Sequence, residues 1–186
     1  MWMTEEAKEP MSETPDSEHH TPQFSHQRHK PPTPLARPRE LILCCAPMRS
    51  NVNLSNIVRT AGCCGITRLI ACGNPKIDKT VARDGADQVQ IDAHRTLVPV
   101  LKELKSQGFT LVGLEQTTNS ISLHDFRFER RTALVIGNER HGLSDEELAL
   151  VDSVVEIPVW GLPYAYNVAN ATAMALYEYC RQFLDG

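Results

Sequence analysis

Short apolar runs alternate with amphipathic segments from residue 41 to the end of the chain. The run LILCCA (41–46) predicts a buried strand. The segment after it carries apolar residues at the spacing of one helix face, namely Leu54, Ile57, Val58, Ala61 and Cys64. Gly65 follows this face directly and predicts the carboxyl end of the helix. RLIAC (68–72) predicts a second strand, which ends at a turn over residues 73–75.

The alternation continues in the second half of the chain. After a short helix near 78–84 and a brief QVQI strand (88–91), a longer helix is predicted up to Gly108, with the apolar residues Leu97, Val98, Leu101 and Leu104. Three further apolar runs predict strands at 109–115, 132–137 and 153–158. Between the last two strands, Ser144 and Glu147 have the spacing of a capping box and predict a small helix.

Strands of continuous apolar character that alternate with helices are typical of an α/β domain. Such strands are buried on both faces, which favours a mostly parallel sheet with helices on both sides. Ligands of these sheets bind beside the carboxyl ends of the strands. The loops that follow the strands are therefore the first places to look for function.

The first 39 residues have a different composition. They hold seven of the twelve prolines and four of the seven histidines, with no glycine or cysteine. This composition predicts a disordered arm at 1–39, ahead of a folded domain at 40–186. The second half of the arm is basic and either touches an RNA backbone or serves only as a linker; its cations are Arg28, Lys30, Arg37 and Arg39.

Composition and charge indicate the cellular location, the redox state of the cysteines and the kind of RNA site to expect. No apolar run is long enough to span a bilayer and no signal peptide is visible, so a cytoplasmic protein without a membrane partner is expected. Adjacent cysteines, as in 44–45 and 63–64, are poorly placed for bridging, and we expect all six cysteines to be reduced. The net charge of −4 gives no general attraction to nucleic acid, so an RNA site must be a local patch.

The fingerprints of the common α/β functions are missing. The loop after the first strand reads APMRSNVNLSN (46–56) and holds no glycine, unlike the turn of a dinucleotide-binding domain. The chain also has neither a phosphate-binding P-loop nor a nucleophile elbow. Standard nucleotide and hydrolase chemistries are therefore disfavoured, and no metal site is predicted.

Three polar segments lie where strands end, and together they predict a pocket: 51–59, 137–142 and 161–167. Each segment has a structural alternative. Asn51 or Asn53 is expected to cap the first helix, and Arg59 is an ordinary surface position. Glu139 is either the partner of an arginine or a site residue, because a carboxylate next to a buried strand needs a partner. The alanine-rich last helix is equally compatible with plain core packing.

Taken together, three stretches resemble the sequence motifs of the SpoU-type, or TrmH-like, branch of the SPOUT superfamily of RNA methyltransferases. They are NLSNIVRTAGCCGI (53–66), LVIGNERHGLS (134–144) and IPVWGLPYAYNVANATAMALYEYCRQ (157–182). The resemblance implies methyl transfer from S-adenosylmethionine to a ribose 2′-hydroxyl of tRNA or rRNA, with RNA rather than DNA as the partner. It also implies a homodimer and an α/β fold with a carboxyl-terminal trefoil knot.

The resemblance also implies roles for single residues. The catalytic positions are Arg59, Glu139 and Asn167. The cofactor is expected among backbone groups near Leu114, Gly137, Ile157 and Tyr166. The RNA is expected to contact Asn53, Arg59 and Arg140. Further cations of a possible RNA surface are Arg83, Arg127, Arg130, Arg131 and His141, with surface ion pairing as the alternative.

Arg59 can be read in two ways. A guanidinium keeps its proton across the physiological pH range, so a role as base demands a large change of state. Clamping the adjacent phosphate and polarising the hydroxyl group requires no change of protonation state. We favour this role for Arg59 and keep the role as base as the alternative.

Three features of the last motif matter for the outcome. A threaded chain end needs close packing, which small residues such as Ala169 and Ala175 permit. A stripe of residues on the same helix is expected to face the pocket at its start and a partner subunit along its length, namely Asn167, Asn170, Met174, Tyr177 and Arg181. Ala165 stands where the family usually has serine. The missing hydroxyl group makes a knotted RNA-binding module without turnover the first alternative. A small-nucleotide enzyme of ordinary doubly wound topology is a separate alternative.

Overall fold

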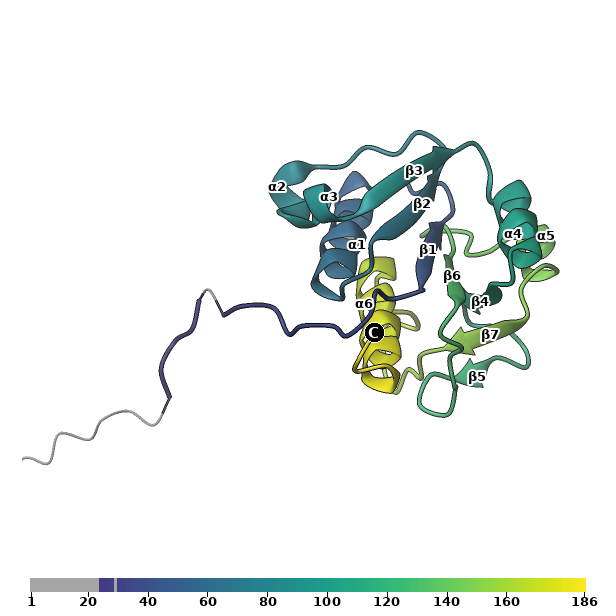
Figure 1. The fold of residues 1–186 in the computed structure, drawn as a ribbon. Coiled ribbons are helices and arrows are strands. Elements are labelled where there is room, and N and C mark those ends of the chain that lie inside the picture. Colours follow the sequence, from purple (N-terminus) through teal and green to yellow (C-terminus); the bar gives the residue numbers. More distant parts are fainter. Residues whose placement is uncertain (1–23, 29) are drawn as a thin grey trace, which may run out of the picture. The chain divides into compact units, whose positions relative to one another are not determined.

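The computed structural model describes residues 24–28 and 30–186, and Pro34–Gly186 form one compact unit. Seven parallel strands make one sheet in the order β3-β2-β1-β6-β4-β7-β5 (Figure 1). The strands are β1 (Ile42–Cys45), β2 (Arg68–Cys72), β3 (Gln90–His94), β4 (Thr110–Leu114), β5 (Ile121–Ser122), β6 (Thr132–Ile136) and β7 (Ser153–Glu156). The helices are α1 (Asn51–Cys63), α2 (Lys79–Ala82), α3 (Gly85–Gln88), α4 (Leu97–Ser106), α5 (Asp145–Leu148) and α6 (Val168–Gln182).

Helices cover both faces of the sheet, as the apolar pattern predicts. Alternate residues of β1 point to opposite sides: Leu43 and Cys45 join a core with α1 and α6, and Ile42 and Cys44 join a core with α4. Figure 1 shows α1, α3 and α6 on one side of the sheet and α4 and α5 on the other. The predicted α/β class with a parallel, doubly covered sheet is confirmed.

Two helix ends have the local structure that the sequence predicts, namely the carboxyl end of α1 and the amino end of α5. Gly65 has a φ of +69° after α1, and the amide of Ile66 donates to the carbonyl of Ala61 at 2.9 Å. This is the glycine-dependent helix end that the sequence predicts. The capping box that precedes α5 is also present, because Ser144 and Glu147 exchange hydrogen bonds.

Differences from the predicted elements lie at the edges of the sheet. The strand expected at 88–91 begins at Gln90, because 85–88 form the short helix α3. β5 has only two residues and was not predicted. Both are edge strands in which polar or exposed residues interrupt the apolar signal. A further difference lies in α4, where Val100 is buried together with the predicted Leu97, Leu101 and Leu104, whereas the predicted Val98 is only half-buried.

The compact unit begins at Pro34, earlier than the predicted domain start at residue 40. The amide of Ala36 donates to the carbonyl of Asp185 at 2.9 Å, and Arg37 forms an ion pair with the Asp185 side chain at 2.8 Å. Arg37 and Arg39 were expected in the basic arm, but both contact the domain. Most of the predicted arm, residues 1–23 and 29, lies outside the described residues.

Arg39 joins the carboxyl ends of two helices. Its side chain is 9% exposed; Nε donates to the carbonyl of Cys64 at 2.8 Å and Nη1 to that of Phe183 at 2.6 Å. Cys64 is the last, capping residue of α1 and Phe183 that of α6. A cation at these positions also interacts favourably with the negative ends of both helix dipoles.

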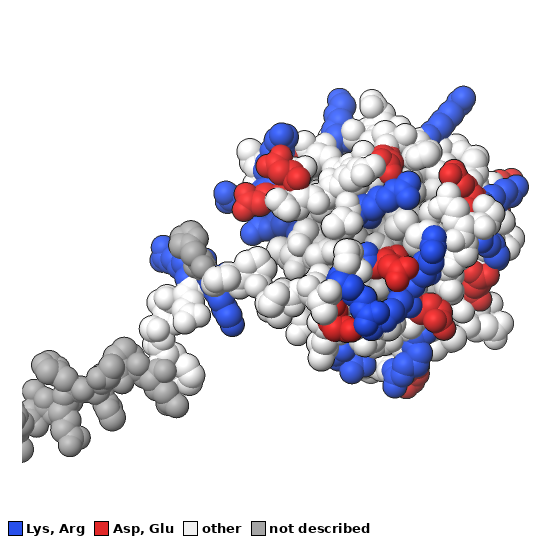
Figure 2. All heavy atoms as spheres, viewed as in Figure 1, with Lys and Arg blue, Asp and Glu red and all other residues white. Residues whose placement is uncertain are grey.

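All six cysteines are free thiols, as predicted. Within the described residues, no helix has the length and apolar character required to cross a membrane. Figure 2 shows basic and acidic side chains interspersed over the visible face of the compact unit. On that face charge alone therefore marks no extended surface for a polyanion.

A cavity at the carboxyl edge of the sheet and its polar cluster

A cavity of about 340 Å³ lies where β4, β6 and β7 end. This volume falls within the range of small-molecule sites. All four residues predicted to bind the cofactor line the cavity: Leu114, Gly137, Ile157 and Tyr166. The structure thus gathers residues from three distant parts of the chain, at the edge of the sheet where the parallel topology predicts a ligand.

Asn138 shapes the loop that forms one wall of the cavity. Its Oδ1 accepts from the amide of Arg140 at 2.9 Å, and its Nδ2 donates to the carbonyl of Pro47 at 2.6 Å. Its backbone pairs with that of Gly142, which has a φ of +66°. A Cβ atom on Gly137 would overlap the backbone of Gly142, so the loop can close only with glycine there. Sequence reasoning missed Asn138, although an asparagine in a turn is a recognisable signal.

Glu139 binds the amino-terminal end of α1 rather than an arginine side chain. Its carboxylate accepts from the backbone amides of Arg49 at 2.9 Å and Ser50 at 3.0 Å, and from Nδ2 of Asn53 at 3.2 Å. Partial burial opposes ionisation, but these hydrogen bonds outweigh it and lower the pKa of Glu139. The first turn of α1 contains no acidic residue, so Glu139 supplies the anion that a helix amino terminus favours.

Asn53 and Asn167 extend this contact to the last helix. Nδ2 of Asn167 donates to Oδ1 of Asn53 at 3.2 Å. Oδ1 of Asn167 accepts from the amide of Ala169 at 2.9 Å and so caps α6. Neither Asn51 nor Asn53 caps α1 as expected, because the side chain of Ser50 takes that position. The Asn53 side chain is thereby left to join Glu139 and Asn167 in one polar cluster.

Arg59 is not part of this cluster in the single chain. It lies on α1 with an exposed side chain and does not line the cavity. Its backbone packs against α3, since a Cβ on Gly85 would stand 2.9 Å from the Arg59 Cα. Of the predicted catalytic residues, the fold therefore brings together Glu139 and Asn167 but leaves Arg59 apart.

The candidate RNA cations divide into two groups. Arg140 is exposed and lines the cavity, and the neighbouring His141 is exposed as well. Arg130 instead has structural contacts, with an ion pair to Asp185 at 2.9 Å and its guanidinium 4.7 Å from the centre of the Phe183 ring. We therefore retain Arg140, and not Arg130, as a candidate for contact with a ligand outside the domain.

Glu139→Gln is expected to destabilise the protein by about 1–2 kcal/mol at neutral pH, because the amide keeps the shape but loses the charge of the hydrogen bonds. The pKa of Glu139 is lowered in the folded state. The carboxylate therefore adds to the free energy of unfolding at pH values above ~4.3, the pKa of glutamate in the unfolded chain. This stabilisation is lost as the pH falls through the lower pKa that Glu139 has in the folded protein. Urea unfolding at pH 7 and at about pH 3 should show the difference between wild type and variant shrinking in acid.

Glu146→Gln provides a matched control, because Glu146 is an exposed carboxylate in the first turn of α5. A Glu139→Gln difference that stays constant, or grows, as the solution is acidified would contradict the described role of the charge.

The amino-acid sequence matches a known protein family and its members. Residues 40–177 match the SpoU rRNA Methylase family. A tRNA (guanosine(18)-2′-O)-methyltransferase of Escherichia coli strain K12 is 31% identical over 149 residues, which are 78% of this chain and 65% of that relative. This chain thus spans slightly less than two thirds of the length of that protein.

Solved structures agree with the sequence match. A TrmH/SpoU tRNA modifying enzyme from A. aeolicus superposes with a TM-score of 0.74 at 30% identity, over 80% of this chain and 77% of that one. The SpoU methyltransferase AviRb from Streptomyces viridochromogenes, in complex with AdoMet, gives 0.67 at 27% identity over 80% and 62%. The resemblance found in the three motifs is confirmed, and the chain belongs to the SpoU rRNA methylase family.

Proposed function

We propose that this protein transfers a methyl group from S-adenosylmethionine to a ribose 2′-hydroxyl in tRNA or rRNA. The observation that carries the proposal is the hydrogen-bonded path from Asn167 through Asn53 to Glu139, beside the cavity. Each of the three residues comes from a different one of the three family motifs. The named activities of the relatives point the same way.

The lining of the cavity fits S-adenosylmethionine. Leu114 and Ile157 offer apolar contact for an adenine ring, and the backbone at Gly137 lies open to the cavity wall. The carboxylates of Glu115 and Glu156 also line the cavity and complement the positive charges of the cofactor. The bound cofactor supplies a methyl group on a positively charged sulfur, which a ribose oxygen can attack.

The polar cluster would hold the reacting groups in place. Glu139 fixes the start of α1 and Asn167 fixes the start of α6, so the two helix ends keep one relative position. Arg59 would clamp the phosphate next to the target ribose and polarise its hydroxyl group. Because Arg59 is exposed and away from the cavity of its own chain, we propose that it serves the cavity of a second protomer.

This arrangement requires a homodimer, which remains a proposal. The stripe predicted to meet a partner is exposed on α6 at Asn170, Met174, Tyr177 and Arg181. The apolar Met174 and Tyr177 are 38% and 73% exposed, which favours a contact surface. The trefoil knot is likewise proposed; the buried Ala169 and Ala175 support close packing of α6. We also propose a cytoplasmic location, where the proposed tRNA or rRNA substrate is available.

A knotted RNA-binding module without turnover is the second candidate. The observation that favours it is Ala165, which lines the cavity where the family usually has a serine hydroxyl. Tyr164 and Tyr166 flank Ala165 and are the candidates for a substitute hydroxyl group, and of the two Tyr166 lines the cavity. Cofactor binding without methyl transfer would select this second function.

The test combines calorimetry with an activity assay. The full chain is expected to bind S-adenosylmethionine, and to pass a labelled methyl group to tRNA or rRNA from cells that lack the gene. Digestion and mass analysis of the nucleosides should then show a 2′-O-methylated product. A chain that binds no cofactor and leaves both RNAs unchanged would overturn the proposal, as would a product methylated on the base.

A further inference from the structure

We propose that Trp160 and Tyr164 form a platform on which an unpaired base of the RNA stacks, next to the nucleotide that is methylated. This inference rests on the proposed function and extends it to substrate recognition. Both residues lie in the loop between β7 and α6, the loop that also supplies Tyr166 to the cavity. We call Trp160 and Tyr164 the aromatic platform.

Exposure is the first observation. Trp160 is 81% exposed and Tyr164 80%, and the intervening Leu162 is 76% exposed. Large apolar side chains gathered on one loop are uncommon on a surface unless they bind a partner. A Cβ atom on Gly161 would meet nothing within 4 Å, so the space beside the loop is open.

The position beside the cavity is the second observation. Tyr164 lines a second hollow that adjoins the main cavity, since both are lined by Gln116, Glu156 and Ile157. A ring stacked on Tyr164 would therefore lie next to the site of methyl transfer. Glu156 disfavours a phosphate at this point, whereas it can accept hydrogen bonds from the amino groups of a base. The charge therefore favours a base rather than the RNA backbone at the platform.

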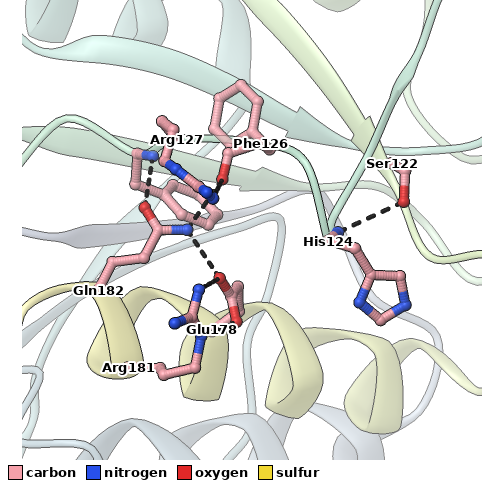
Figure 3. Close-up of polar contacts among 8 residues, drawn as sticks. Ser122, His124, Phe126, Arg127, Glu178, Arg181 and Gln182 are labelled. Carbon is pink, nitrogen blue, oxygen red and sulfur yellow. Dashed lines mark hydrogen bonds and ion pairs between the residues drawn. The ribbon is translucent and has the colours of Figure 1, made fainter.

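A fixed support under Trp160 is the third observation. The rings of Trp160 and His124 stack at 6.3 Å with 30° between their planes. His124 belongs to a segment that Gln182 of α6 holds through the amide of Phe128 and the carbonyl of Phe126, both at 2.9 Å. Figure 3 shows this anchor, with the imidazole of His124 directed away from it. The indole therefore stacks on a residue that lies two positions before an anchored segment, and it still leaves most of its surface free.

Single-stranded RNA is the occupant that these features fit. Proteins read unpaired bases by stacking them on aromatic side chains, and duplex RNA offers no free base face. Arg140 is exposed on the rim of the main cavity and can meet the phosphate of the same strand. A second copy of the chain is the competing occupant, and the test below separates the two.

Trp160 provides its own reporter, because the chain has only two tryptophans and the other is Trp2. In a Trp2→Phe protein, single-stranded octamers of riboadenylate and of ribouridylate should quench the fluorescence of Trp160. A duplex of the same length should quench it much less. If neither octamer quenched the fluorescence of Trp160, the inference would be overturned. So would emission that is already blue-shifted and changes only with protein concentration, because a second copy would then cover the indole.

Paired substitutions separate ring stacking from apolar bulk. Trp160→Leu and Tyr164→Leu are each expected to weaken octamer binding about 5- to 100-fold, whereas Trp160→Phe and Tyr164→Phe keep most of it. S-adenosylmethionine affinity should be unchanged in all four variants, which also reports an intact fold. Equal RNA binding by the leucine and phenylalanine variants would refute stacking.

The outcome is distinguishable from that of the proposed function. If the wild-type chain binds octamers through the aromatic platform but methylates no RNA, the methyltransferase proposal fails, and the stacking of an unpaired base on the platform stands without it. If the wild-type chain methylates RNA while the leucine variants bind and methylate as well as wild type, the inference alone fails.

Discussion

Arg59→Ala is expected to lower the rate of methyl transfer about 10²- to 10³-fold, the usual effect of removing one group that stabilises charge in a transition state. Arg59→Lys should be nearly as slow, because an ammonium group cannot reproduce the two-pronged contact of a guanidinium with phosphate. Cofactor affinity should be unaffected, since Arg59 is proposed to contact the phosphate and the ribose hydroxyl group of the RNA rather than the cofactor. Single-turnover rates and calorimetry measure the two quantities separately.

Arg95→Ala is a suitable control because Arg95 is also exposed but belongs to none of the three motifs. Near-normal turnover by Arg59→Lys would exclude both a bidentate clamp and a special base.

A mixing experiment tests whether Arg59 contributes to the site of the other protomer. Arg59→Ala and Asn167→Ala proteins, each inactive alone, should together recover about a quarter of wild-type activity, because half of the dimers hold one intact site. No recovery from dimers that do exchange would place Arg59 in its own chain's site.

Tyr179→Ala is expected to destabilise the fold by about 3–5 kcal/mol, the range for truncating a large buried aromatic side chain. Tyr179 has no exposed surface, and its ring packs against Phe128 and Phe183 with centroid distances of 5.7 and 4.8 Å. Its hydroxyl group donates to the carbonyl of Arg130 at 2.6 Å. Urea unfolding monitored by circular dichroism measures the loss.

Tyr179→Phe separates the ring from the hydroxyl group and should cost only about 1 kcal/mol. The exposed Tyr177, two residues earlier on the same helix, offers a comparison for aromatic truncation at the surface. If Tyr179→Ala were as mild as Tyr179→Phe, α6 would not be packed as described. Because α6 carries Asn167 at its start, such loose packing would also remove the support of the polar cluster.

The central strands and the long helices could be predicted because their signals are local. β1, β2, β4 and β6 lie inside the sheet, where burial on both faces makes the apolar run continuous. β3 and β5 lie at its edges, where half of that signal is lost. The end of α1 could also be predicted from a local signal, because it depends on the positive φ angle of Gly65 alone.

The candidate site was only partly predictable. Motif resemblance located Glu139, Asn53 and Asn167, but their contacts join residues 86 to 114 positions apart, which no local pattern encodes. The Asn138 turn and the Ser50 cap depend on how the loop closes onto Pro47 and Glu139. The exposure of Arg59 agrees with the surface position that the sequence offered as the alternative, but its absence from the lining of the cavity could not be predicted, because periodicity gives a helix face and not what lies opposite it.

The position of Arg39 has a practical consequence for work with isolated domains. The family match starts at residue 40, and a fragment trimmed to that match would begin one residue after the guanidinium that joins α1 to α6. Both helices would then fray at their final turns, and the segment that ends at Gly186 would lose its anchor on Arg37. Shortened versions of this protein are best started at or before Pro34, where the compact unit begins.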